Sequence, residues 1–321
     1  MKKLKVVLLV AAILFSTGCG KTNTPASKKV TVAQYAHLLI YYPIYLAQQK
    51  GFYEKNGLSV NFVGTGGDDK TFAAVSSRSA LFGVADPTFA AIAREKGLKA
   101  KVIGTLIDGA PMWIVSNENI DMSSSDALKN KRIMTYPSPS TSYTLLSEII
   151  ASLKPKTDGA QIVQGAFGTE FATVESKNAD AFFTIEPVAS TGVDKGYNIV
   201  YSAMDQFGPM SFSGITALDE TVEKDPATIK AFLLSVQQAM DYLRSNFDES
   251  VELAAKEFPE TKKSILRDAL KRMLDENVMP TTLVTTETSW NKAIEIRIKV
   301  GDLKTAPQYG EIVANQFLPK K

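Results

Sequence analysis

Cysteine and histidine are almost absent from this chain of 321 residues, which contains one of each, Cys19 and His37. A disulfide within the chain needs two cysteines, and zinc sites built from cysteine and histidine need several such ligands. Both are excluded by counting, as is a Cys–His catalytic pair in the body of the chain that follows Cys19. We therefore expect a protein that uses neither a metal ion nor a cofactor.

An excess of charge of one sign is also missing. Lys and Arg total 36 and Asp and Glu total 34, so the net charge is +2. Lys2, Lys3 and Lys5 lie at the start of the chain, and without them 33 cations face 34 acids. Such a nearly neutral body offers no electrostatic surface for nucleic acid. The hydrophobic content of 45% and charged content of 22% are ordinary for a globular protein.

The apolar run Val6–Phe15 is too short to cross a membrane, which takes about 20 residues. It follows a basic start and precedes small residues and Cys19, the arrangement of a secretory signal. Segment 1–19 resembles a bacterial lipoprotein signal, although Ser16 stands where leucine is usual. The resemblance implies cleavage before Cys19 and its lipidation, with 20–29 as a flexible tether. Ordinary secretion with an incidental cysteine is the alternative.

Short runs rich in Val, Ile and Phe alternate with helix-like stretches as far as Leu218. This alternation predicts an α/β protein with mainly parallel sheets. The expected strands are Val30–Gln34, Leu58–Val63, Leu81–Ala85, Ala100–Thr105, Trp113–Ser116, Arg132–Tyr136, Ala160–Val163, Ala181–Thr184, Ile199–Tyr201 and Phe212–Leu218. The expected helices between them include Pro43–Gln49, Lys70–Val75, Pro87–Glu95 and Tyr143–Leu153.

After Leu218 apolar residues recur at helical spacing in three stretches. The first starts at Pro226, a residue favoured at the beginning of a helix. The pattern predicts one-sided helices that pack on the rest of the protein. Their apolar stripes are Ile229, Phe232, Leu233, Val236, Met240, Leu243 and Phe247, then Ile265, Leu266, Ala269, Leu270, Met273 and Leu274, then Tyr309, Ile312, Val313 and Phe317.

Five segments in order carry a family resemblance. They are Pro43–Ser59 (PIYLAQQKGFYEKNGLS), Ser79–Asp86 (SALFGVAD), Asp126–Tyr143 (DALKNKRIMTYPSPSTSY), Thr184–Pro187 (TIEP) and Asp225–Leu243 (DPATIKAFLLSVQQAMDYL). Together they resemble solute-binding proteins of the nitrate/sulfonate/taurine and thiamine-pyrimidine type. Asn130 replaces a usual glycine, and Thr184 replaces a usual tryptophan, which removes an aromatic ring from the expected cleft.

The resemblance implies a two-lobed periplasmic-binding-protein fold of type II, with the lobes joined by two crossing strands. Lobe 1 would comprise 30–114 and 208–321, and lobe 2 would comprise 115–207. The crossings are expected near Ile114–Ser116 and Phe207–Ser211.

The same resemblance implies a monomeric receptor of an ABC importer, not an enzyme. It would be held outside the cytoplasm by the lipid anchor and would deliver a small solute to a permease driven by a cytoplasmic ATPase. An enzyme on the same fold and the ligand-binding subunit of a sensor are the alternatives.

In open α/β sheets, ligands bind beyond the carboxyl ends of the strands. Applied to the loops of lobe 1, this rule gives His37, Tyr41, Tyr42, Thr65, Gly66, Gly67, Asp86 and Thr88 as candidate ligand contacts. In lobe 2 it gives Ser138, Ser140, Thr141, Ser142 and Glu186.

Each candidate carries a chemical reason. The tyrosines can stack on a flat ligand, and the glycines allow close backbone approach. The hydroxyls of 138–142 surround a helix start, where free backbone N–H groups bind polar atoms. Asp86 and Glu186 each precede a proline and can accept hydrogen bonds from an amine. Helix capping alone is the alternative for the acids and for 138–142, with Asp68 or Asp69 expected as a further cap.

The seven arginines fall outside these loops. Without a guanidinium fork, tight binding of a sulfate-like group is disfavoured. The acids favour an amine- or pyrimidine-like solute, and a sulfonate held by a helix N-terminus is the alternative.

Overall fold

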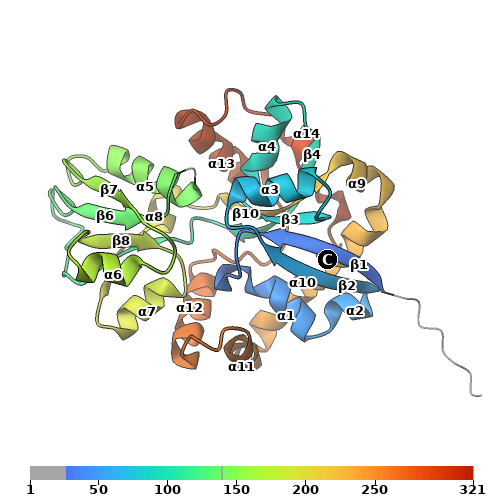
Figure 1. Cartoon of the computed structure of the whole chain (residues 1–321), viewed down its shortest axis with the longest axis horizontal. Helices are drawn as coiled ribbons and strands as arrows, with labels where there is room; N and C mark the ends of the chain where they lie inside the picture. The colour runs from blue at the N-terminus through green and yellow to red at the C-terminus, as the bar shows by residue number, and fades with distance from the viewer. Residues whose placement is uncertain (1–26, 139, 321) are drawn as a thin grey trace, which may run out of the picture.

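The computed structural model describes residues 27–138 and 140–320 (Figure 1). Within them ten strands form two five-stranded sheets. The first has the order β2 (Leu58–Gly64), β1 (Lys28–Gln34), β3 (Phe82–Ala85), β10 (Ser211–Leu218) and β4 (Ala100–Asp108). The second has the order β7 (Gln161–Gln164), β6 (Arg132–Thr135), β8 (Ala181–Thr184), β5 (Trp113–Ser116) and β9 (Asn198–Ser202). The expected cleavage and lipidation at Cys19 lie outside the described residues.

Helices cover both sheets, and the sheets with their helices lie side by side as two lobes (Figure 1). Lobe 1 holds the first sheet, and lobe 2 holds the second sheet, residues 113–202. Helices near the first sheet are α1 (Tyr42–Gln49), α2 (Phe52–Lys55), α3 (Asp68–Ser76) and α4 (Thr88–Glu95). The lobe 2 stretch and its exit carry α5 (Thr141–Ser152), α6 (Glu170–Glu175), α7 (Val188–Asp194) and α8 (Ala203–Phe207). The C-terminal segment carries α9 (Asp219–Lys224), α10 (Pro226–Ser245), α11 (Phe247–Glu257), α12 (Lys263–Asp275), α13 (Glu287–Lys299) and α14 (Tyr309–Ile312).

The prediction of mainly parallel sheets is wrong, because each sheet has two parallel and two antiparallel pairs. In lobe 1, β1 pairs in parallel with β2 and β3, and β10 is antiparallel to β3 and β4. In lobe 2, β6 pairs in parallel with β7 and β8, and β5 is antiparallel to β8 and β9. The inner strands β3, β10, β8 and β5 are buried at every residue because helices cover both faces.

Each of the ten predicted strands is present within two residues of its expected ends, except that β4 continues three residues beyond Thr105 to Asp108. Of the three predicted C-terminal stripes, the first lies in α10 and the start of α11, and the second in α12. The third is shorter than predicted, because α14 spans only one turn and a 3₁₀ turn (Asn315–Phe317) follows it. Helix α13 was not predicted, and it carries the buried Trp290 and Arg297.

The chain passes between the lobes at 109–112 and 203–210, because β4 ends at Asp108 and β10 begins at Ser211. The crossing expected at Ile114–Ser116 is therefore wrong: these residues lie inside β5 of the second sheet. The two crossovers are tied together, since the Gly109 N–H donates to the Met210 carbonyl at 2.7 Å. Gly109 has a φ of 142°, in the region that favours glycine.

Helices α12 and α13 flank the junction of the lobes on opposite sides (Figure 1). Each presents cations to acids of lobe 2. From α12, Arg272 Nε lies 2.8 Å from Glu186 Oε1, and just before it Lys262 lies 2.7 Å from Asp194. From α13, Lys299 pairs with Glu148. The C-terminal segment therefore holds lobe 2 through charge complementarity.

Candidate functional site

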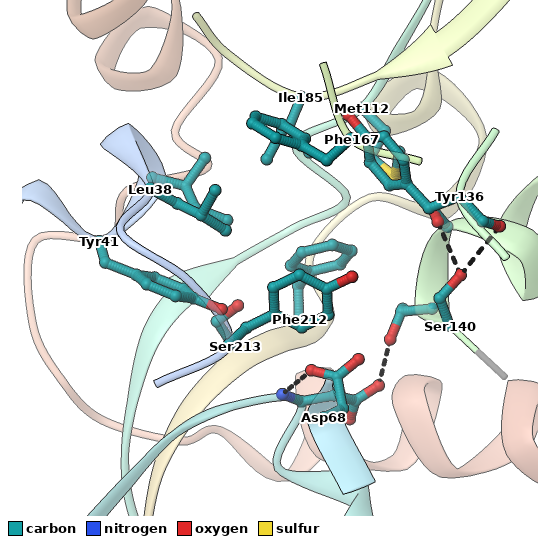
Figure 2. A pocket seen from close by; sticks show the side chains of 15 residues that line it. Leu38, Tyr41, Asp68, Met112, Tyr136, Ser140, Phe167, Ile185, Phe212 and Ser213 are labelled. Carbon is teal, nitrogen blue, oxygen red and sulfur yellow. Dashed lines mark hydrogen bonds between the residues drawn. The ribbon is translucent and has the colours of Figure 1, made fainter. Parts of the chain in front are cut away.

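The loops that follow the strands of both sheets enclose a cavity of about 50 Å³ (Figure 2). Lobe 1 contributes the loops after β1, β2 and β3 together with the start of β10, and lobe 2 contributes the loops after β6, β7 and β8. The carboxyl ends of the parallel strands point to this place in both lobes, as the sheet rule predicts.

The walls of the cavity are mainly apolar. The rings of Tyr41 and Phe212 lie on one side, and Tyr136 and Phe167 lie across from them (Figure 2). The aliphatic lining is Leu38, Ile40, Met112 and Ile185. Phe167 is 45% exposed and packs on Tyr136 with ring centroids 5.6 Å apart, so it covers the wall at the surface. Such rings suit the faces of a flat solute.

Two carboxylates interrupt the apolar lining, Asp68 and Asp86. Asp68 begins α3 and is 8% exposed, and its Oδ1 accepts the Asp86 backbone N–H at 3.1 Å. Burial and the negative charge of Asp86 raise the pKa of Asp68 to about 7, against the lowering effects of that N–H and of Arg297. Asp68 therefore changes its charge near neutral pH while lining the cavity.

Asp86 follows β3 and is bound on both of its oxygens. Its Oδ1 accepts the backbone N–H of Thr88 at 2.8 Å and the Thr88 hydroxyl at 2.6 Å. Asp86 is nevertheless not the N-cap of α4, because Pro87 occupies that position. Its Oδ2 accepts the Thr141 hydroxyl and an Arg297 N–H, each at 2.5 Å. Because Thr141 belongs to lobe 2, Asp86 joins the two lobes directly.

Arg297 brings a guanidinium to the site from α13, which the sequence analysis did not foresee. The side chain is 2% exposed and bonds Asp86, Thr88, Thr141 and Asp302. Burial alone would lower the pKa of Arg297, but Asp86 and Asp302 raise it above its ordinary value. Arg297 is therefore a cation whose charge two carboxylates already balance. Of the described residues, the fifteen that line the cavity include no lysine or arginine.

Five of the sequence-predicted residues line the cavity: Tyr41, Asp86, Ser140, Thr141 and Ser142. Ser140 is also the N-cap of α5, since its Oγ accepts the Tyr143 N–H. Tyr41 is almost fully buried. Its pKa is raised well above the ordinary value, mainly by burial and to a smaller extent by the negative charge of Asp68. The predicted loops after β1, β3 and β6 therefore meet at one place.

Glu186 and Tyr42 are turned away from the cavity. Glu186 is 0% exposed, and it accepts the backbone N–H and hydroxyl of Ser190 and the Nε of Arg272. Burial raises its pKa, and these bonds oppose the rise. Tyr42 lies in the core of lobe 1, where its hydroxyl donates to the Ser250 carbonyl at 2.6 Å. Neither placement supports the expected contact with a solute.

The remaining predicted residues surround the cavity without lining it. His37 binds Glu257 at 2.9 Å and stacks on Phe258. The Thr65 hydroxyl donates to the carbonyls of Gln34 in β1 and Gly67 in its own turn, where Gly66 has a φ of 77°. The Thr88 hydroxyl donates to Asp86, and Ser138 is exposed. The predicted capping role of Asp68 or Asp69 is wrong, because Gly67 is the N-cap of α3 and makes no side-chain cap bond.

Several residues of the site were not among the predicted ligand contacts: Tyr35, Leu38, Ile40, Asp68, Met112, Tyr136, Phe167, Ile185, Phe212, Ser213 and Arg297. The first three lie inside the predicted loop after β1, so the strand-end rule contained them. Phe212 was assigned to a strand. Arg297 lies 211 residues after Asp86, and nothing in the local pattern connects the two.

No helix within residues 27–138 and 140–320 is long and apolar enough to pass through a membrane.

Two curated relatives align with nearly the whole chain. Binding protein YtlA of Bacillus subtilis is 24% identical over 302 residues, covering 91% of this chain and 89% of the relative. The riboflavin-binding protein RibY of Chloroflexus aurantiacus is 23% identical over 350 residues, covering 99% of both chains.

Solved structures share the architecture. A ligand-binding component of an ABC-type import system from Staphylococcus aureus, with zinc bound, superposes with a TM-score of 0.74 at 12% identity, over 91% of this chain and 98% of that one. The alkanesulfonate-binding protein SsuA of Xanthomonas axonopodis pv. citri, bound to MOPS, gives a TM-score of 0.66 at 16% identity, over 92% and 95%. The predicted periplasmic-binding-protein fold is thereby confirmed.

The family model described as NMT1/THI5 like matches residues 40–250, about two thirds of the chain. This stretch contains every strand of the two sheets except β1, and most of the loops that line the cavity. By that match the chain belongs to the NMT1/THI5 like family.

Proposed function

We propose that the protein is the solute-binding component of an ABC importer. It captures a small solute between its lobes outside the cytoplasm and presents it, as a monomer, to a permease powered by a cytoplasmic ATPase. The observation that carries the proposal is the cavity between the strand ends of both lobes. Membership of the family and the fold shared with importer components support it.

The solute that fits the lining is flat and carries a hydrogen-bond donor, as an amine-, pyrimidine- or flavin-like compound does. Aromatic rings stand on both sides, and the Asp68 carboxylate faces the space between them. The riboflavin-binding name of one relative is consistent with this class. A sulfonate is the less favoured alternative, because Asp86 and Asp302 already balance the charge of Arg297.

The lobes must separate for a solute to enter. A cavity of about 50 Å³ is far smaller than the roughly 300 Å³ or more of an ordinary small-molecule site. Rotation about the crossovers at 109–112 and 203–210 would widen it, since these two segments join the lobes.

A thermal-shift screen with riboflavin, aminopyrimidines, polyamines, alkanesulfonates and nitrate tests the proposal. We expect one of the donor-bearing compounds to raise the melting temperature. A ligand at 100 times its dissociation constant adds about 2.7 kcal/mol of stability. Asp68→Asn should weaken that response by about tenfold or more in affinity, because a hydrogen bond to a charged group is lost, whereas the exposed Asp69→Asn should not. Stabilisation by sulfonates or nitrate alone would contradict the proposed solute class.

We also propose that Cys19 carries the lipid anchor, on the strength of its position after a short apolar run. Two acyl chains would hold the protein at the membrane surface. Cells labelled with palmitate should incorporate the label in the wild type and not in Cys19→Ala. Equal labelling of the two would show that Cys19 is not the acceptor.

A further inference from the structure

Asp86 is a carboxylate surrounded by donors. Two come from Thr88 on its own loop, one from Thr141 in lobe 2 and one from Arg297 in the C-terminal segment. The three partners and Asp86 are each at most 7% exposed. Water therefore cannot replace these bonds easily, and a negative group is required at this position to satisfy them.

The surroundings are those of an anion site. Thr141 is the first residue of the twelve-residue helix α5, and a helix N-terminus favours negative charge. The Arg297 guanidinium adds a full positive charge on the other side of the carboxylate. Asp86 thus supplies, from lobe 1, the anion that the N-terminus of a lobe 2 helix and a buried arginine together attract.

We propose that Asp86 is a built-in anion that sets the specificity of the site and closes the lobes. It occupies the anion position between α5 and Arg297, so an anionic solute finds that position filled. Its bond to Thr141 also holds the two lobes together directly. The specificity part rests on the proposed function, because it assumes that the cavity takes the solute.

Repulsion between the carboxylates of the cavity and an anionic solute also disfavours binding of that solute. A sulfonate in the cavity would meet Asp86 and Asp68 in a buried place where repulsion is weakly screened. Asp86 and Asp302 neutralise the charge of Arg297, so Arg297 does not attract a sulfonate. A solute with a donor group meets acceptors instead.

Removal of the carboxylate tests the proposal without knowledge of the natural solute. Asp86→Ala leaves the donors of Thr88, Thr141 and Arg297 around a space the size of formate. We expect this variant to melt below the wild type, and sodium formate to raise its melting temperature by about 2 °C or more above matched sodium chloride. If the variant does not fold alone, formate should restore its far-ultraviolet circular dichroism. A response to formate no larger than that to chloride, folded or unfolded, overturns the proposal.

Calorimetry with methanesulfonate tests the exclusion. The wild type should show no binding, and Asp86→Ala should bind it, while the exposed Asp69→Ala should behave as the wild type. Binding of methanesulfonate by the wild type overturns the exclusion.

Thr141→Val tests the closure, because it removes the bond from Asp86 to lobe 2 and leaves Asp86 paired with Arg297. Small-angle scattering should show a larger radius of gyration for Thr141→Val than for the wild type, with no gain of a formate response. An unchanged radius overturns the closure. These measurements need no natural solute. A thermal-shift screen that finds no solute would therefore count against the proposed function and would not change their outcome.

Discussion

At the scale of a residue, Asp68 shows how a buried carboxyl group that lines the cavity can weaken the folded protein. Its carboxylate is buried beside that of Asp86, and its pKa rises from an ordinary 3.8 to about 7. The folded protein therefore holds this proton more tightly than the unfolded chain does. Stability falls as the pH rises from about 4 to about 7, where the unfolded chain has released the proton and the folded one has not.

We predict that Asp68→Asn stabilises the protein at pH 8 and stabilises it much less at pH 5. The amide keeps an acceptor for the Asp86 N–H but cannot be charged. Each unit of pKa shift corresponds to about 1.4 kcal/mol, so the gain at pH 8 is on the order of a few kcal/mol. Melting curves at the two pH values measure it.

Asp69→Asn is the matched control, because Asp69 is the next residue of α3 and is exposed. Its melting temperature should follow the wild type at both pH values. An Asp68→Asn protein that is equally stabilised, or destabilised, at pH 5 and pH 8 would show that Asp68 does not carry a raised pKa.

At the scale of elements, the contact between α7 and α12 depends on one buried ion pair. Glu186 precedes α7 and is 0% exposed, while its partner Arg272 lies on α12 and is about a quarter exposed. Removing one partner of such a pair leaves an uncompensated charge, which costs roughly 3–5 kcal/mol when both members are buried. The pair is therefore sensitive to the loss of its cation.

We predict that Arg272→Gln lowers the free energy of unfolding by about 2–3 kcal/mol, toward the lower end because Arg272 is partly exposed. The loss should be larger at pH 8 than at pH 5. Burial already raises the pKa of Glu186, and without Arg272 the carboxyl can relieve the remaining penalty only by taking up a proton. Urea unfolding at the two pH values measures both effects.

Lys271→Gln provides the comparison, since Lys271 is the neighbouring cation on α12 and pairs with Asp275 at the exposed surface. It should cost well under 1 kcal/mol at either pH. Adding Glu186→Gln to Arg272→Gln should recover part of the lost stability. A double variant no more stable than Arg272→Gln would exclude the buried charge as the cause.

At the scale of the whole molecule, the strands and the loops at their ends could be predicted from the sequence. Strands such as Ala181–Thr184 are short runs rich in apolar residues, so local composition identifies them. The place of the cavity then follows from strand direction alone. Helix α13 was not predicted, because its buried face includes the polar residues Ser289 and Arg297 beside Trp290 and does not form a purely apolar stripe.

Which of the predicted polar residues line the cavity could not be told from the sequence, because tertiary contacts decide it. Asp86 and Glu186 both precede a proline after an inner strand, and local sequence treats them alike. Asp86 lines the cavity because its loop faces lobe 2, whereas Glu186 is taken by Arg272 of α12. The partners Arg297 and Arg272 come from the far end of the chain, and only the folded arrangement brings them near.

The sheet order has a consequence for the order in which the lobes can form during synthesis. Once Ser202 has been synthesised, all five strands of the second sheet are present. The first and last residues of this lobe lie side by side, because Trp113 pairs with Ser202. The first sheet at that moment lacks β10, which separates β3 from β4. The N-terminal lobe must therefore remain unfinished on the ribosome while the later-made lobe between its halves already has every strand it needs.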